Sequence, residues 1–199
     1  MKKIFSLIAS LALFALLSAG FAESFNLNPV ETHALFRIKR ANTSFLFGRF
    51  DELSGSLSYD VENPEASSIE FLALTESVST GIENPDNDFD AARRDGHLRS
   101  PDFFDAAQFP TLSFVSKSVA ATDDPNILEV TGDLTIHGVT NEVTVMVEKT
   151  GEGQDQQGNA MVGFYTEFNI NRSDYGMTNL EQLAGDEVLI MISLLGMAQ

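Results

Sequence analysis

The sequence contains no cysteine and no tryptophan, and it has few basic residues. Without cysteine the chain cannot form a disulfide, so we expect the hydrophobic core alone to stabilise the fold. Its 12 lysine and arginine residues stand against 29 aspartate and glutamate residues, a formal net charge of −17. Because nucleic-acid binding requires a basic surface that neutralises phosphates, we expect no nucleic-acid partner.

Histidine is also scarce, with only His33, His97 and His137. None has the spacing of a metal-binding pair, and there is no thiol, so the sequence predicts no metal site. It has no nucleophile elbow and no phosphate-binding glycine-rich loop, and we assign no catalytic residues. One alternative stays open, in which Asp95 and His97 form the acid–base pair of an enzyme that acts on a lipid or quinone.

The N-terminus has the pattern of a cleaved signal peptide. Lys2 and Lys3 precede an apolar run over residues 4–17, and Gly20 and Ala22 are small residues at the positions that a signal peptidase reads. The run is shorter than the roughly 20 residues that span a bilayer. We predict a signal peptide over residues 1–22 and one domain over residues 23–199, located in the periplasm or secreted.

Removal of this leader would leave 10 basic residues against 29 acidic ones, a net charge of −19. We do not expect so acidic a domain to dock directly on an anionic membrane surface. Thirteen of the 16 phenylalanines would remain, which suits either a large core or an apolar cavity.

Most of the domain alternates apolar and polar residues with the period of a half-buried β-strand. The predicted strands cover residues 34–39 with a continuation over 44–50, then residues 53–59, 68–74, 111–116, 126–136, 139–150, 163–170 and 187–195. His137-Gly138 suits a tight hairpin turn. In the middle, Asn84-Pro85 predicts the start of a helix that Gly96 ends or interrupts, and a short helix is expected near residues 178–183.

About eight mostly sequential strands predict an all-β domain with a short helical segment. Eight such strands can close into an antiparallel barrel that holds one small ligand. A two-sheet sandwich is the alternative.

Several motifs carry a resemblance to a known family. Residues 94–105, RDGHLRSPDFFD, are followed by Phe109-Pro110-Thr111, and further motifs lie at residues 48–55, 132–140, 171–177 and 185–188. With these motifs the chain resembles the YceI-like family of exported, lipocalin-like proteins, which bind polyisoprenoids. It departs from the family at Arg40, where a histidine is common, and residues 82–92 are longer and more acidic than usual.

The resemblance implies an eight-stranded antiparallel lipocalin-like β-barrel that binds a polyisoprenoid, an isoprenoid quinone or a similar long lipid, with no other cofactor. The apolar residues predicted to line its pore are Phe36, Ile38, Phe45, Phe47, Phe71, Leu98, Phe103, Phe104, Phe114, Phe164 and Phe168. Asp95, His97 and Arg99 are predicted to form the mouth and contact the headgroup. For these three residues, a structural network that fixes the helical segment is the alternative. A homodimer and a membrane-bound electron-transfer protein are open alternatives for partners.

Overall fold

The computed structural model describes residues 22–81 and 91–198, and every structural statement below refers to them. The predicted signal peptide therefore lies outside the described residues, except for Ala22. The strands are β1 (Glu23–Leu27), β2 (His33–Arg40), β3 (Ser44–Phe50), β4 (Leu53–Tyr59), β5 (Ser68–Leu74), β6 (Val78–Ser79), β7 (Thr111–Ala121), β8 (Ile127–Ile136), β9 (Val139–Gln154), β10 (Ala160–Asn171) and β11 (Ala184–Ala198). One α-helix, α1 (Ala91–Arg99), and three short 3-10 turns accompany them.

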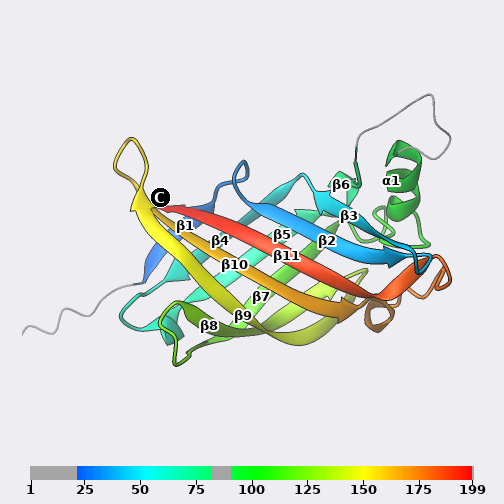
Figure 1. Ribbon diagram of the computed structural model, residues 1–199. Coiled ribbons are helices and arrows are strands. Elements are labelled where there is room, and N and C mark those ends of the chain that lie inside the picture. Colours follow the sequence, from blue (N-terminus) through cyan, green and yellow to red (C-terminus); the bar gives the residue numbers. More distant parts are fainter. Residues whose placement is uncertain (1–21, 82–90, 199) are drawn as a thin grey trace, which may run out of the picture.

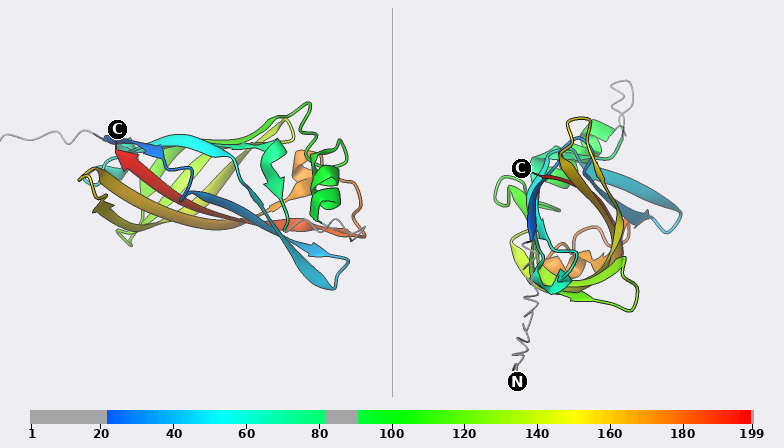
Figure 2. Two further views of the ribbon diagram at one scale, coloured as in Figure 1. Left: turned by 90° about the horizontal axis from the view of Figure 1, so that it is seen from above. Right: turned by 90° about the vertical axis from the view of Figure 1, so that its left-hand side faces the viewer.

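Eight of the strands form a closed antiparallel barrel. Around the ring they follow the order β1-β4-β5-β7-β8-β9-β10-β11, and β11 pairs again with β1. The view along the barrel shows the closed wall (Figure 2). The barrel predicted from the sequence is thus confirmed, and the two-sheet sandwich is excluded.

The other three strands extend the wall beyond β1. Residues 188–193 of β11 pair with β2, whereas residues 196–198 of the same strand pair with β1. β3 then pairs with β2, and β6 pairs with the end of β3. The β2–β3 hairpin reaches the end of the molecule that also carries α1, which we call the α1 end (Figure 1).

The β8–β9 hairpin shows how the sequence sets the strand register. In β8 Leu128, Val130, Leu134 and Ile136 are buried at alternating positions, while the intervening side chains are more exposed. The turn consists of His137 and Gly138, with φ angles of 51° and 74°, as the two central residues of a tight primed turn require. This turn was predicted and is confirmed.

The end of the barrel remote from α1 is filled by apolar side chains. Phe25, Leu57, Val162 and Phe164 are buried there with Tyr59, whose ring lies edge-on to Phe164 at a centroid distance of 5.3 Å. Leu57, Tyr59 and Phe164 also line the interior cavity described below, so this packing forms its wall at the end remote from α1.

The helical predictions needed correction. The predicted helix start at Asn84-Pro85 lies outside the described residues, and α1 continues through Gly96 to Arg99. The helix expected near residues 178–183 is a series of turns. No helix among the described residues has the length and apolar character needed to cross a membrane.

Candidate functional site

A cavity of about 800 Å³ lies inside the barrel. This volume is in the upper part of the range of about 300–1,000 Å³ that is typical of small-molecule sites. Its wall consists mainly of inward-facing Leu, Ile, Val and Phe side chains from β2, β5, β7, β8, β9, β10 and β11. β11 has 15 residues, and a strand rises about 3.3 Å per residue, so the barrel can enclose a ligand that is long and narrow.

Nine of the eleven apolar residues predicted for the pore line this cavity. They are Phe36, Ile38, Phe71, Leu98, Phe103, Phe104, Phe114, Phe164 and Phe168. Strands on opposite sides of the ring and the segment that follows β6 all contribute to this set. Whether these side chains contact a ligand stays a prediction.

Phe45 and Phe47 do not line the cavity, which corrects the prediction for these two residues. Each is 55 % exposed on the outer face of β3. Alternation along the strand instead turns Leu46 and Phe50 inward, and both line the cavity. Outside the barrel, the guanidinium of Arg37 lies 4.5 Å from the centre of the Phe45 ring.

The loop after α1 covers part of the cavity with aromatic rings. Phe104 lies edge-on to Phe36 and Phe50, at centroid distances of 6.4 and 5.5 Å. Phe103 packs edge-on against His97 at 5.1 Å. These contacts hold the family motif of residues 94–105 over the α1 end of the cavity.

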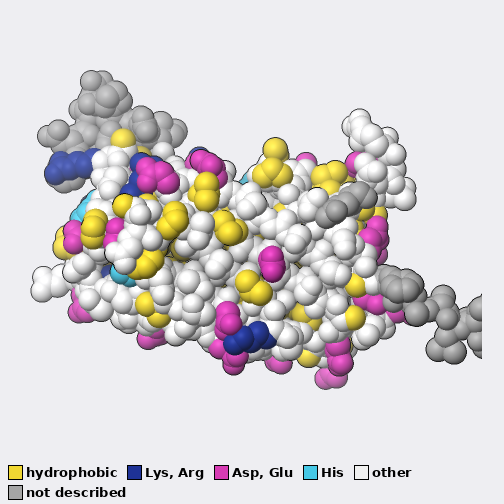
Figure 3. Space-filling view, turned by 180° about the vertical axis from the view of Figure 1, so that it is seen from behind, with side chains coloured by type: hydrophobic (Ala, Val, Ile, Leu, Met, Phe, Trp, Pro, Cys, Tyr) yellow, Lys and Arg dark blue, Asp and Glu magenta, His cyan; other side chains and the backbone are white. Residues whose placement is uncertain are grey.

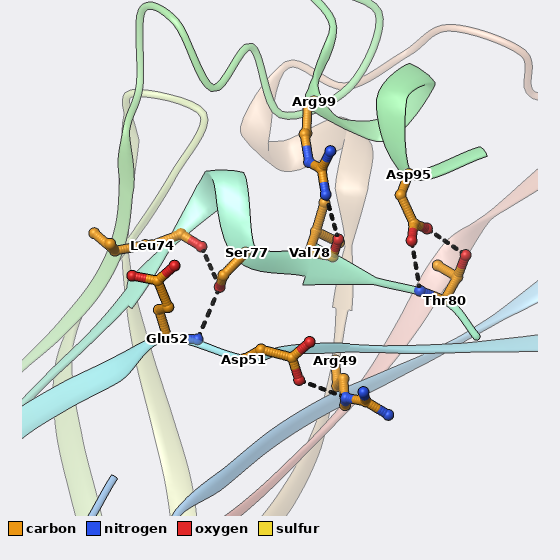
Figure 4. Close-up of polar contacts among 9 residues, drawn as sticks. All are labelled: Arg49, Asp51, Glu52, Leu74, Ser77, Val78, Thr80, Asp95 and Arg99. Carbon is orange, nitrogen blue, oxygen red and sulfur yellow. Dashed lines mark hydrogen bonds and ion pairs between the residues drawn. The ribbon is translucent and has the colours of Figure 1, made fainter. Parts of the chain in front are cut away.

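Asp95 anchors α1 to Thr80, the residue that follows β6. Its carboxylate is buried and accepts hydrogen bonds from the hydroxyl of Thr80 and from the backbone N–H of Thr80, the latter at 3.2 Å (Figure 4). Arg94 also donates to the Thr80 hydroxyl, at 2.5 Å. Asp95 does not line the cavity, and its contacts agree with the structural alternative rather than with the headgroup role.

Arg99 likewise contacts the protein rather than the cavity. It donates from Nη2 to the carbonyl oxygen of Val78 at 3.2 Å, and its Nε lies 3.6 Å from a carboxylate oxygen of Glu76 (Figure 4). Together with Asp95, this residue fixes the helix on β6.

His97 lines the cavity, but it does not pair with Asp95. Its Nε2 lies 3.0 Å from a carboxylate oxygen of Asp102. Residues two apart on a helix project in different directions, so Asp95 faces Thr80 and His97 faces away from it. The acid–base pair required by the enzyme alternative is therefore not assembled in this structure.

His137 contacts other protein groups at the turn between β8 and β9. Its Nδ1 lies 3.2 Å from the carbonyl oxygen of Tyr175, and its ring packs edge-on to Phe109. Burial raises the pKa of the phenol of the neighbouring Tyr175, a residue that is only 2 % exposed. Among the described residues, no group of three or more His, Asp or Glu side chains is arranged to hold a metal ion.

Sequence reasoning missed the basic residues of the cavity. Lys39 and Arg40 at the end of β2, Arg93 and Arg94 in α1, and Arg172 all line it. No aspartate or glutamate does so among the described residues. The available signal was the occurrence of two adjacent basic pairs, 39–40 and 93–94, in a strongly acidic chain.

Arg172 is held by the protein through all three nitrogen atoms of its guanidinium. The side chain is 2 % exposed and donates to the carbonyl oxygens of Met177, Ala184 and Gly185. It ties the turn after β10 to the start of β11, which places both segments at the α1 end.

The chain is similar to known proteins over nearly its whole length. Residues 25–195 match the family model described as the YceI-like domain. Protein YceI of Salmonella newport is 36% identical over 194 residues, covering 96% of this chain and 95% of that protein.

Solved structures share the fold. A structure of Burkholderia cenocepacia BcnA has a TM-score of 0.73 at 23% identity and covers 85% of this chain and 98% of its own. A second, described as a polyisoprenoid binding domain from Saccharophagus degradans implicated in plant cell wall breakdown, has a TM-score of 0.65 at 17% identity. It covers 89% of this chain and 99% of its own. With a family match over most of the domain, the chain belongs to the YceI-like family.

Proposed function

We propose that this protein is a non-catalytic carrier or store for a long-chain amphiphile of the polyisoprenoid or isoprenoid quinone type. The observation that carries the proposal is the apolar cavity of about 800 Å³ inside a closed YceI-like barrel. The polyisoprenoid-binding description of the Saccharophagus degradans domain supports this class of ligand. The leader pattern at residues 1–22 supports a site of action in the periplasm.

Binding of such a ligand does not require polar contacts along its hydrocarbon chain. Enclosing a few hundred Å² of apolar surface yields on the order of 10 kcal/mol at about 25 cal/mol per Å², before the cost of association. Aromatic and aliphatic side chains around the cavity provide this environment. Catalysis would require a set of reacting groups, and Asp95 and His97 do not meet.

Lipid extraction and native mass spectrometry of the purified protein test the proposal directly. We expect a co-purifying apolar ligand, and after delipidation we expect binding of a polyprenyl compound or quinone with one molecule per chain. Repeated purification without such a ligand, together with no binding after its addition, would contradict the proposal.

A matched pair of substitutions locates the binding. Phe168→Gln places an amide in the cavity wall, where it is hydrated in the empty barrel and must lose water when an apolar chain enters, so affinity should fall. Phe47→Gln makes the same chemical change on the outer face and should leave affinity unaltered. Equal effects of both substitutions would place the binding outside the barrel.

Homodimerisation and docking on a membrane electron-transfer protein stay predictions. Both are compatible with a carrier that delivers its ligand. Size-exclusion chromatography with light scattering and a pull-down from solubilised membranes would test them.

A further inference from the structure

The charges that line the cavity are opposite in sign to the charge of the chain. The sequence after residue 22 has 10 basic and 29 acidic residues. The cavity is nevertheless lined by Lys39, Arg40, Arg93, Arg94 and Arg172, and by no carboxylate among the described residues. Half of the basic side chains have therefore been placed around one site in an acidic protein.

These five residues all come from segments at the α1 end. Arg40 pairs in register with Ala184, and the carbonyl of Ala184 also accepts a hydrogen bond from Arg172. Arg93 and Arg94 belong to α1, which lies at the same end (Figure 1). In the space-filling view, lysine and arginine side chains gather near this end, whereas acidic side chains are spread over the whole face (Figure 3).

Lys39 and Arg40 differ from Arg94 and Arg172 because, among the described residues, their side chains have neither an ion pair nor a hydrogen bond. Arg94 donates to Thr80, and Arg172 donates to three carbonyl groups. Lys39 and Arg40 are exposed, and within residues 22–81 and 91–198 neither side chain forms an ion pair. Exposed basic residues elsewhere, such as Lys117, do form ion pairs with carboxylates.

We propose that the α1 end of the cavity binds the anionic end group of the amphiphile, a phosphate or carboxylate, through Lys39 and Arg40. This inference rests on the proposed function and names the polar part of its ligand. The apolar chain occupies the barrel, and the end group stays near the opening at the end of β2, where Lys39 and Arg40 border the cavity and water still solvates it. A neutral end group gains nothing from these charges, so the site distinguishes amphiphiles by headgroup.

The test compares ligands that differ only in the end group. Delipidated protein is titrated with geranylgeranyl phosphate and geranylgeraniol, and with palmitate and palmityl alcohol, by displacement of the neutral probe N-phenyl-1-naphthylamine. At low salt we expect the anionic member of at least one pair to bind about three- to thirtyfold more tightly. The preference should shrink in 0.5 M NaCl because salt screens exposed charges. A preference in the phosphate pair alone would identify phosphates as the end group, and one in the carboxylate pair alone would identify carboxylates.

Substitutions assign the preference to these two residues. Lys39→Gln/Arg40→Gln should bring the anionic ligand to within about twofold of its alcohol, with the affinity for the alcohol unchanged. The control, Arg49→Gln/Lys117→Gln, also removes one arginine and one lysine. Both of its residues form ion pairs on the outer surface, so the preference should persist.

The outcomes separate this inference from the proposed function. Equal affinity for alcohol and anion in the unaltered protein would overturn the inference and leave the carrier function standing. The same would follow if the double substitution weakened both ligands equally, or if the control abolished the preference. Failure of all four amphiphiles to bind would instead contradict the carrier function itself.

Discussion

Gly48 illustrates how single residues shape the cavity wall. It lies opposite Phe36 in the β2–β3 pair, and the Phe36 ring covers it. A Cβ atom on Gly48 would overlap the end of this ring, and the ring itself lines the cavity. The glycine therefore allows a large aromatic side chain to lie flat against the strand.

Gly48→Ala should lower the free energy of unfolding by about 1–3 kcal/mol, because the Phe36 ring must leave its position. Urea denaturation would measure the change. Gly151→Ala is the control, since a Cβ atom there meets nothing within 4 Å. A second substitution, Phe36→Leu, should recover part of the loss, and a loss that is unaffected by Phe36→Leu would contradict this explanation.

Arg172 is the second residue with a strong expected effect. Arg172→Met preserves much of the side-chain length but leaves the carbonyl groups of Met177, Ala184 and Gly185 without their donor. We expect a loss of about 3 kcal/mol or more in the free energy of unfolding, since buried unsatisfied groups cost about 1–3 kcal/mol each. Chemical denaturation checks it, with Arg37→Met as the control on the outer face. Losses of equal size would show that these hydrogen bonds contribute little.

For single residues, the sequence predicted well which types of side chain line the cavity. It predicted less well which face of a strand each side chain occupies. Phe45, Leu46 and Phe47 are all apolar, so the first part of β3 does not alternate, and only Arg49 near its end marks the outer face. The choice is made by pairing with β2 and by the contact of Gly48 with Phe36, neither of which the local sequence shows. Elsewhere a polar neighbour marks the outer face, as in β8, and the alternation is sufficient.

The helix α1 depends on polar contacts for its position. It buries only Ala91 and Asp95, and Asp95 forms two hydrogen bonds with Thr80. Such bonds to a charged group are each worth about 1.5–3 kcal/mol. The helix is thus an element that can detach locally while the barrel remains folded.

Asp95→Ala should release α1 without unfolding the barrel. Amide hydrogen exchange over residues 91–99 should become at least about tenfold faster, while exchange in β8 and β9 stays unchanged. Asp102→Ala serves as the control, because its partner His97 is exposed. Unchanged exchange in the helix, or a global acceleration, would show that Asp95 does not act as a local anchor.

Several elements could not be predicted from local sequence. β1 has five residues directly after the predicted leader, and it is recognisable as a strand only through its pairing with β4 and β11. β6 has two residues and owes its strand conformation to β3. α1 passes Gly96 because contacts at Thr80 compensate for the weak helix propensity of glycine.

Ligand binding should increase the free energy of unfolding of the whole molecule. A ligand at 100 times its dissociation constant adds about 2.7 kcal/mol to the free energy of unfolding. In a chain of this size, that should raise the melting temperature of delipidated protein by roughly 5–10 °C. Differential scanning calorimetry with and without a prenyl ligand would measure the shift. Phe168→Gln should reduce the shift and Phe47→Gln should not, and an absent shift with saturating ligand would contradict enclosure in the barrel.

The global architecture was predictable because strand alternation, turn residues and family motifs all indicated the same barrel. The positions of the charges in space were not predictable, because the net charge of a sequence does not say where individual charges lie. The acidic composition gave no sign of a basic cluster, yet the fold brings Arg40, Arg93 and Arg172 to one cavity. Residues that are far apart in the chain meet there only after the strands have paired.

The pairing of β1 with β11 also constrains the order of events during synthesis. Phe25 lies opposite Ala198, so the ring cannot close before residues 184–198 have left the ribosome. Until then the early strands lack a neighbour on one side and the apolar interior is open to solvent. A chain that stops before β11 therefore has no means of sealing the barrel wall.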